Sequence, residues 1–415
     1  MKVITNRRLF LVYFLPVLLL GIFLGSYFYN NKDSNYKDNC KDNLFNDGIN
    51  IRGGLPNTKE KILKGQPINV VYFGGSITQM DGWRNKTTEW LQNTFTNSIF
   101  REYNSCISGS GSYFGVYRLE DDVINYSPDI VFIEFAVNDS TSDYYINGAL
   151  KNNFIEMLSR IKNAKPDSDI VFVYTISKKM LPFYNNKKIY SSAEKMEEIA
   201  AKFNIPSINF GFRTSSLWQY KLLRFDTNDN YPNYIPLFSS DGVHPEQYGH
   251  EIYASVMKDF FKMALDDSCN DSVSVKFDSL SFKTHHFVNI NNCLFTPELN
   301  NKINVRMKYG KDSMFSKTNL LAHVWNSQEL NIKTKASTFG MVISMPPGSY
   351  SYEAAIDNKI EKQKFYNLGS PNPRLFYSEF DIPNDEKFHN IKIIHRDNID
   401  YNLIFFLTDG EIIEK

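Results

Sequence analysis

The stretch "VVYFGGSIT" (70–78) joins a run of apolar residues to two glycines and a serine, Ser76. The run begins at Ile68 and contains one polar residue, Asn69, and such short apolar runs are typical of strands buried on both faces. Two more runs of this kind follow, "DIVFIEFAV" (129–137) and "DIVFVYTI" (169–176). By itself, the first stretch leaves open whether Ser76 is a nucleophile at a strand end or a residue of a glycine turn.

Segments with helical spacing separate these strands. Helices are predicted over 84–101, 147–164, 191–204 and 245–265, with a further short strand over 205–210. Continuous apolar strands that alternate with helices predict a flavodoxin-like parallel sheet with helices on both faces. In such open sheets the ligand site lies beyond the carboxyl ends of the strands. Ser76, Asn138 and Asp139 follow strand ends and are therefore candidate site residues.

The pattern of apolar and polar residues changes from about residue 271, where short alternating or apolar runs are separated by turns. Examples are "TFGMVISM" (338–345) and "NLIFFLTDG" (402–410). This pattern predicts an antiparallel, sandwich-like β domain. The predicted organisation is a cytoplasmic tail (1–8), a transmembrane anchor (9–29), a linker (30–66), an α/β domain (67–268) and a C-terminal β domain (271–415).

The N-terminal stretch "LFLVYFLPVLLLGIFLGSYFY" (9–29) carries no charge and has about the ~20 residues that a bilayer-spanning helix needs. Lys2, Arg7 and Arg8 precede it and favour a cytoplasmic N-terminus. The alternative is a cleaved signal peptide, but no A-x-A-like cleavage pattern follows, which favours an anchor. Either reading places the rest of the chain outside the cytoplasm, membrane-bound in the first case and secreted in the second.

Composition excludes some classes of function. Lys+Arg and Asp+Glu both number 46, so the formal net charge is zero and no basic nucleic-acid surface is expected. Cys40, Cys106, Cys269 and Cys293 form no metal-type motif, and the histidines of the β domain lack ligand spacing, so we predict no metal and no cofactor. In an exported protein Cys269 could pair with Cys293, whereas the apolar surroundings of Cys106 indicate a buried thiol.

The segment "SSDGVHPEQYG" (239–249) contains a candidate base and acid. Acyl transfer through Ser76 needs a base to take its proton and an acid to orient that base. Asp-Gly forms a turn, and Pro245 suits the first position of the following helix. Asp241, three residues before His244, could then reach its Nδ1 atom. The alternative is that Asp241 and His244 are only turn and cap residues.

Two further segments could donate hydrogen bonds to the oxyanion of the tetrahedral intermediate. The glycine-rich "NSCISGSGSYFGVYRLEDDV" (104–123) could present backbone N–H groups, and "FAVNDS" (135–140) contains the Asn138 amide. Each could equally be an ordinary turn.

In chain order, "GGSIT", "ISG", "VND" and "DGVHP" resemble the four sequence blocks of the SGNH (GDSL-type) hydrolases. The first block departs from the usual form, since Gly75 precedes the serine where Asp is common. This glycine and the continuation to "VND" resemble the branch that acts on bacterial polysaccharides. The resemblance covers about residues 67–265 and not the β domain. The α/β-hydrolase motif G-x-S-x-G is excluded because Thr78 occupies its second glycine position.

The resemblance implies the SGNH hydrolase fold and a role for each candidate residue. Ser76 would be the nucleophile, His244 the base and Asp241 its orienting acid. The backbone N–H groups of Ser76 and Gly109 and the Asn138 side chain would form the oxyanion hole, with Gly111 as the alternative to Gly109.

The implied function is that of a membrane-anchored serine esterase. It would remove an O-acyl group from a carbohydrate or polysaccharide through an acyl-serine intermediate, and acetyl is the expected acyl group. Two alternatives remain: an O-acetyltransferase that modifies a cell-surface polysaccharide with the same triad, and a non-catalytic polysaccharide-binding protein. The long aromatic-rich connection 211–240 could contact sugar rings or pack on itself. Arg118 is expected to form an ion pair rather than a substrate clamp, and Glu134 to accept loop N–H groups.

Overall fold

The computed structural model describes residues 48–140, 149–266, 284–289, 300–302, 311–314, 321–325, 329–345, 348–367, 374–395 and 401–413. Within these ranges, none of the helices combines the length and the apolar character needed to cross a bilayer. The predicted anchor 9–29 and the cysteines Cys40, Cys269 and Cys293 lie outside the described residues. Cys106 is a buried free thiol, as predicted.

A mixed six-stranded sheet forms the centre of the α/β domain, with the strand order β1-β6-β5-β4-β2-β3. Its strands are β1 (Ile49–Asn50), β2 (Ile68–Gly74), β3 (Phe100–Asn104), β4 (Ile130–Glu134), β5 (Asp169–Tyr174) and β6 (Ser207–Asn209). The strands β2 to β6 pair in parallel, whereas β1 is antiparallel to β6. The order β3-β2-β4-β5-β6 is the flavodoxin-like one, in which the connections change direction between β2 and β4.

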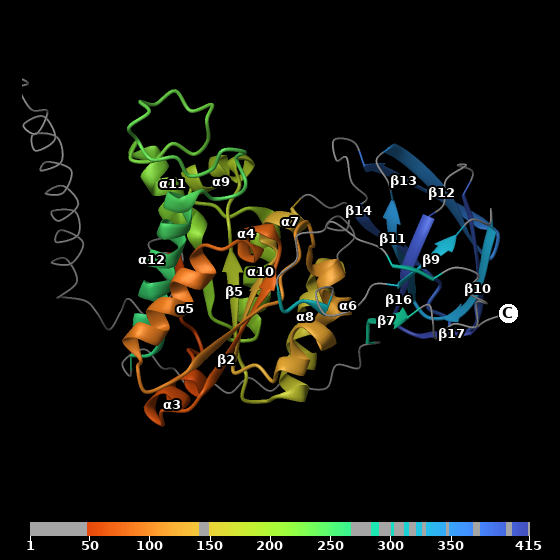
Figure 1. Cartoon of the computed structure of the whole chain (residues 1–415), viewed down its shortest axis with the longest axis horizontal. Helices are drawn as coiled ribbons and strands as arrows, with labels where there is room; N and C mark the ends of the chain where they lie inside the picture. The colour runs from red at the N-terminus through yellow and green to blue at the C-terminus, as the bar shows by residue number, and fades with distance from the viewer. Residues whose placement is uncertain are drawn as a thin grey trace, which may run out of the picture.

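Helices cover both faces of this sheet (Figure 1). On one face lie α6 (Ser112–Asp122), α8 (Ala149–Ala164) and α10 (Ser191–Lys202), and on the other lie α3 (Pro56–Leu63), α5 (Trp83–Thr94), α11 (Phe210–Gln219) and α12 (Gln247–Ala264). Strand β2 shows why both faces are buried. Val71 and Phe73 join the first hydrophobic cluster while Val70 and Tyr72 join the second, because successive side chains of a strand point to opposite faces.

The structure corrects four sequence-based expectations. The helix predicted over 84–101 ends at Thr94, and the edge strand β3 begins at Phe100. The predicted linker 30–66 contains β1 and α3, which contact the sheet. The connection 211–240 begins with helix α11. Pro245 is not the first residue of the last helix: it forms a bridge with Ser239, and α12 starts at Gln247 because the preceding backbone is still extended.

The C-terminal region forms two antiparallel sheets, ordered β13-β12-β15-β10-β17 and β14-β11-β16-β9-β8, with β7 paired to β16. The strands are β7 (His286–Asn289), β8 (Asn300–Lys302), β9 (Leu321–Trp325), β10 (Glu329–Lys335), β11 (Thr338–Met345), β12 (Gly348–Ile356), β13 (Lys359–Asn367), β14 (Arg374–Asp381), β15 (His389–His395), β16 (Tyr401–Thr408) and β17 (Glu411–Ile413). The predicted antiparallel domain is therefore confirmed.

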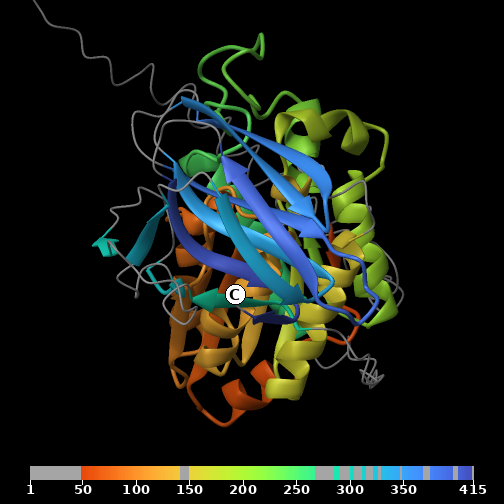
Figure 2. The ribbon, with the colours of Figure 1, turned by 90° about the vertical axis from the view of Figure 1, so that its right-hand side faces the viewer.

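The β domain lies beside the α/β domain in Figure 1 and in front of it in the view of Figure 2. Met314, Val342 and Leu407 belong to the same buried cluster as the residues of α6 and α8. One hydrophobic cluster is thus shared by both domains. Shared clusters of this kind oppose free relative motion of domains.

Candidate active site

The turn after β2 presents Ser76 at the carboxyl edge of the sheet. Gly75 precedes the one-turn helix α4 (Ser76–Gln79). A Cβ atom on Gly75 would lie 2.1 Å from Oδ1 of Asn138, and one on Gly74 would lie 2.5 Å from the backbone oxygen of Glu134. At Gly74 the obstacle is the backbone of β4, which excludes a side chain, whereas at Gly75 it is the side-chain amide of Asn138. The glycine that departs from the usual pattern therefore leaves room for this orientation of the Asn138 amide.

Ser76, His244 and Asp241 form a continuous chain of hydrogen bonds. The Oγ atom of Ser76 lies 2.8 Å from Nε2 of His244, and Nδ1 of His244 lies 2.6 Å from Oδ2 of Asp241. The residues come from α4 and from the loop before α12, 168 positions apart. The structure therefore brings together the three residues that the sequence analysis selected, in the order that a serine hydrolase requires.

The charge of Asp241 selects the tautomer of His244. Burial raises the pKa of Asp241, but hydrogen bonds from the His244 ring, the N–H groups of His244 and Val243 and the Ser239 hydroxyl outweigh it. The resulting pKa is well below its ordinary value. A carboxylate only accepts hydrogen bonds, so Nδ1 of His244 must carry a proton, which leaves Nε2 free to accept the Ser76 proton.

The loop that carries Asp241 and His244 is held from outside by Lys178, which the sequence analysis missed. The Lys178 N–H donates to the Gly242 oxygen at 2.8 Å, and Gly242 has a φ of +79°, which favours glycine. The ammonium group of Lys178 lies 2.6 Å from carboxylate oxygens of both Asp226 and Asp229. Lys178 thus ties the connection 211–240 to the catalytic loop. Nothing in the local sequence distinguishes it from other lysines.

Asn138 and Gly109 lie on the two neighbouring loops. Asn138 is in α7 (Ala136–Asp139), directly after β4, and its side chain lies against Gly75. Gly109 has a φ of +75°, and a Cβ atom there would meet no other atom within 4 Å, so its surroundings are open. Gly111, the alternative donor, is instead the N-cap of α6 and lies against Asp139. The roles of Asn138 and Gly109 as oxyanion donors stay predictions.

Asp139 connects these two loops. Its Oδ1 atom accepts the Ser112 N–H at 2.8 Å, which holds the start of α6 against the turn that carries Asn138. The residue is buried, and burial raises its pKa to about 7 despite that hydrogen bond. Asp139 is therefore a structural link, and its contact explains why Asp follows Asn in "VND".

We expect Asn138→Ala to lower kcat about 10²–10³-fold, the usual cost of removing one oxyanion donor. The reason is that the amide would donate to the charge that develops on the carbonyl oxygen. Initial rates with an aryl acetate measure this, and Asn125→Ala, at an exposed asparagine, is the matched control. An unchanged kcat in Asn138→Ala would remove this residue from the oxyanion hole.

Arg118 and Glu134 are buried residues that contact the segments on either side of Ser76. Arg118 is fully buried and pairs with Asp122 at 2.5 Å, which confirms the predicted ion pair. The Glu134 carboxylate accepts the hydroxyls of Thr78 at 2.8 Å and Thr175 at 2.6 Å. The Gly75 N–H also lowers the pKa of this carboxylate by hydrogen bonding, as expected of a loop N–H group, and it lies 3.2 Å from the Glu134 backbone oxygen.

Burial raises the pKa of Glu134 from its ordinary 4.5 to about 7, although Thr175, Thr78 and the Gly75 N–H favour the charged form. Between these two pH values the folded state holds more protons than the unfolded state. The free energy of unfolding therefore falls as pH rises through this window, by up to about 1.4 kcal/mol per unit for one group.

We expect Glu134→Gln to remove this contribution, because glutamine does not titrate. In urea unfolding at about pH 5, 6 and 7, the wild-type protein should lose stability relative to the variant as pH rises. Asp167→Asn, at an exposed carboxylate, is the matched control. Parallel pH profiles for wild type and Glu134→Gln would show that Glu134 titrates normally.

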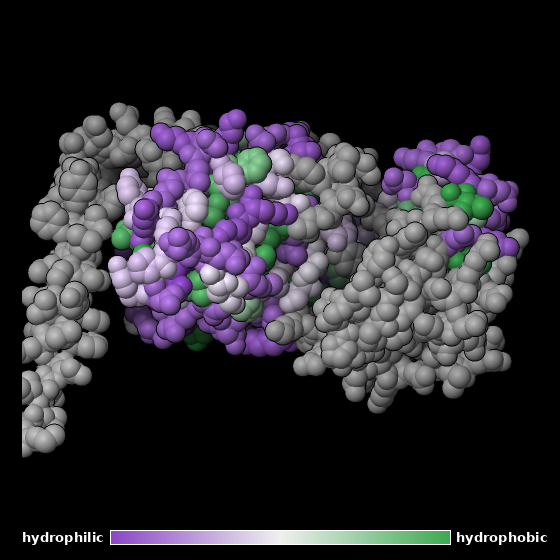
Figure 3. Space-filling view, turned by 90° about the horizontal axis from the view of Figure 1, so that it is seen from above, coloured by the Kyte–Doolittle hydropathy of each residue, from purple (hydrophilic) through white to green (hydrophobic). Residues whose placement is uncertain are grey.

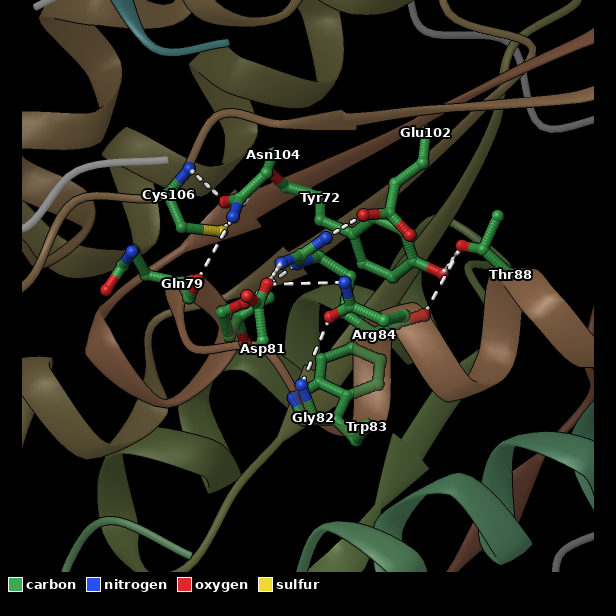
Figure 4. A network of polar contacts seen from close by, with 12 residues as sticks. Tyr72, Gln79, Asp81, Gly82, Trp83, Arg84, Thr88, Glu102, Asn104 and Cys106 are labelled. Atoms are coloured by element: carbon green, nitrogen blue, oxygen red, sulfur yellow. Dashed lines mark hydrogen bonds and ion pairs between the residues drawn. The ribbon is translucent and has the colours of Figure 1, made fainter. Parts of the chain in front are cut away.

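The far end of α4 is held by a second polar network (Figure 4). The Nε atom of Arg84 donates to the Thr78 oxygen at 3.1 Å, and Nδ2 of Asn104 donates to the Gln79 oxygen at 3.0 Å. Arg84 also pairs with Glu102 and is only 2% exposed. A helix of one turn leaves its carbonyl groups without internal partners, so these contacts stabilise the turn that begins with Ser76. Sequence analysis missed both residues.

Comparisons with known proteins agree with this architecture. The model of the GDSL-like lipase/acylhydrolase family matches residues 72–252. No curated protein matches the sequence. A two-domain esterase active on acetylated mannans, crystallised with mannopentaose, has a TM-score of 0.66 and 18% identity, covering 89% of this chain and 99% of that one. A second structure of a two-domain esterase active on acetylated mannans has the same TM-score, with 17% identity over 88% and 98% of the chains.

An acetylxylan esterase from Geobacillus stearothermophilus has a TM-score of 0.37 and 19% identity, and covers 50% of this chain and 97% of that one. The two mannan esterase structures share only 18% and 17% sequence identity with this chain, so their likeness shows a common fold and no more. This common fold extends over both domains.

Proposed function

Since residues 72–252 belong to the GDSL-like lipase/acylhydrolase family and the protein is accordingly a carboxylic ester hydrolase, we propose that it removes O-acetyl groups from a carbohydrate or polysaccharide. The observation that carries this proposal is the hydrogen-bonded chain of Ser76, His244 and Asp241. The similarity in fold to an esterase active on acetylated mannans supports the choice of substrate.

The surface around the site also favours a polar substrate. In Figure 1 the turns α4 and α7 lie near the upper edge of the sheet, and Figure 3 shows the molecule from that side. Among the residues coloured in this view, hydrophilic ones predominate, and hydrophobic ones are scattered rather than gathered into a patch. A long acyl chain would need a continuous apolar surface, whereas an acetylated sugar needs polar contacts.

The proposed reaction has two steps. Oγ of Ser76 attacks the acetyl carbonyl carbon while its proton passes to Nε2 of His244, and the tetrahedral oxyanion accepts hydrogen bonds from Ser76 N–H, Gly109 N–H and the Asn138 amide. The carbon–oxygen bond to the sugar then breaks, and His244 returns the proton to the sugar oxygen. Water next attacks the acetyl-serine with His244 as base, releasing acetate and restoring Ser76.

The aromatic connection 211–240 divides into two groups. Phe225 and Phe238 are buried against each other with ring centroids 4.6 Å apart, and the Trp218 indole N–H donates to Asp229 at 2.8 Å. Tyr220 and Tyr234 are instead 75% and 86% exposed. The first group holds the connection together, and we assign the contact with sugar rings to the two exposed tyrosines.

We also propose that the segment 9–29 anchors the enzyme in a membrane with the α/β and β domains outside the cytoplasm. The support is the charge-free length of this segment and the basic residues before it. Fractionation of cells that express the full chain, with protease added from outside, tests both the anchor and its orientation.

The decisive experiment follows acetyl groups by NMR after the protein is mixed with acetylated mannan. An esterase releases free acetate, whereas an O-acetyltransferase moves acetyl groups to an added, unacetylated sugar acceptor. Ser76→Ala serves as the control in both cases. Equal, slow rates for wild type and Ser76→Ala, with retained binding to the polysaccharide, would favour a binding protein on this scaffold.

A further inference from the structure

The segment Lys311–Met314 of the C-terminal region forms hydrogen bonds directly with the α/β domain. The Asn104 N–H donates to Oδ2 of Asp312 at 2.8 Å, and the Asp312 N–H donates back to the Asn104 oxygen at 3.1 Å. The Met314 N–H donates to the Asp122 carboxylate. Ser313 and Met314 are buried. The segment therefore continues the hydrogen bonding of the edge strand β3, which ends at Asn104.

A first chain of contacts leads from Asp312 to the end of α4. Asp312 holds the backbone of Asn104 on both its N–H and its oxygen. The Asn104 side chain in turn donates to the Gln79 oxygen at 3.0 Å (Figure 4). Gln79 is the last residue of the turn that Ser76 begins. A shift of Asn104 would therefore be passed on to this turn.

A second chain leads from Met314 to the start of the same turn. Asp122 accepts both the Met314 N–H and the Arg118 guanidinium. Nη2 of Arg118 donates to the Gly74 oxygen at 3.3 Å and to the Ser110 hydroxyl at 3.2 Å. Gly74 ends the strand before Ser76, and Ser110 follows Gly109 in the glycine loop. Arg118 is fully buried, with its charge 4.2 Å from the centroid of the Phe73 ring.

We infer that Asp312 and Met314 are positioning residues of the esterase, which set the geometry of the Ser76 turn and the glycine loop through Asn104 and through Asp122 with Arg118. The α/β domain is then incomplete as a catalyst without this segment of the C-terminal region. The physical reason is that a misplacement of about 1 Å at reacting atoms can cost on the order of 10²-fold in rate. The inference rests on the proposed function only in taking Ser76 as nucleophile.

The test compares kcat and KM of the full chain on an aryl acetate, which reports the acyl-transfer step without a polysaccharide. Asp312→Ala should lower kcat about tenfold or more with little change in KM. Asp312→Asn keeps an oxygen that accepts the Asn104 N–H and should recover most of the loss. Asn104→Asp, which loses the donor to Gln79 but keeps the acceptor for the Cys106 N–H, should resemble Asp312→Ala.

The matched control is His285→Ala, which removes a different contact between the domains. His285 Nδ1 lies 2.6 Å from Oε2 of Glu156 on α8, and this pair belongs to neither of the two chains of contacts described above. Thermal unfolding shows whether each variant is folded. A wild-type kcat in folded Asp312→Ala and Asn104→Asp overturns the inference, and so does an equal fall in His285→Ala, because the effect would then come from domain docking in general.

Labelling with a fluorophosphonate separates this inference from the proposed function. The probe bonds to an activated serine oxygen with loss of fluoride, and mass spectrometry of the tryptic peptide 65–84 locates it. Absence of label on wild-type Ser76 would contradict the proposed nucleophile itself. Labelling of wild type and Asp312→Ala at the same rate would contradict only the positioning role, whereas slower labelling of the variant supports it.

Discussion

Ser76→Ala is expected to lower kcat for acetate esters on the order of 10⁶-fold while the protein stays folded. Without Oγ no acyl-enzyme can form, and His244 has no hydroxyl to activate. The fold should survive because the turn that begins with Ser76 is held through backbone atoms: Arg84 bonds the Thr78 oxygen, and Asn104 bonds the Gln79 oxygen. The residual rate should come from direct attack of water on the ester, accelerated only by substrate binding and by the oxyanion donors.

Initial rates with an aryl acetate and with acetylated mannan measure this prediction, and the unfolding temperature verifies the fold. Ser255→Ala is the matched control, because the Ser255 hydroxyl donates to the Ile252 oxygen within α12 rather than to the triad. A fall of less than about 10³-fold in Ser76→Ala would mean that another group carries the reaction.

Asp241→Asn is expected to lower kcat on the order of 10⁴-fold, the second largest effect. Asparagine keeps the size of the side chain, and its oxygen can still accept the N–H groups of Val243 and His244, which Oδ1 of Asp241 accepts at 2.8 Å each. Its amide group would then face Nδ1 of His244 as a donor. The ring would be forced to carry its proton on Nε2, where it could no longer accept the proton of Ser76.

Kinetics and a fold comparison with Asp259→Asn test this prediction, since Asp259 pairs with Arg213 on the surface. The KM should change little, because Asp241 contacts His244 and the loop rather than the substrate. An activity of Asp241→Asn within about tenfold of wild type would contradict the assignment of Asp241 as the orienting acid.

Much of the α/β domain could be predicted from local pattern. The runs at 68–73, 130–134 and 169–174 were recognisable as strands because, apart from the half-buried Asn69, their side chains are apolar or buried, and the segments between them carry helical spacing. The errors have local causes as well. Residues 100–104 continue beyond a helix without a proline or glycine, so the edge strand β3 gives no boundary signal. Residues 49–50 form a strand of two residues, too short for any periodicity.

For the candidate site too, some features could be predicted from the sequence and others only from the structure. The sequence by itself determined which residues could supply a nucleophile, a base, an acid and oxyanion donors, because each follows a strand or precedes a helix in a recognisable block. Only the tertiary structure showed that Gly75 leaves room for the side-chain amide of Asn138, since Asn138 lies in the separate turn α7.

The supporting contacts were also decided by the tertiary structure. Lys178, Arg84 and Asp312 sit in ordinary local sequence, and each acts on a backbone oxygen or N–H of a loop that is distant in the chain or across a turn. A backbone group has no residue identity, so no pattern of side chains records which partner will reach it. The path of the chain alone brings Asp312 to Asn104, 208 positions away, and thereby to the turn that presents Ser76.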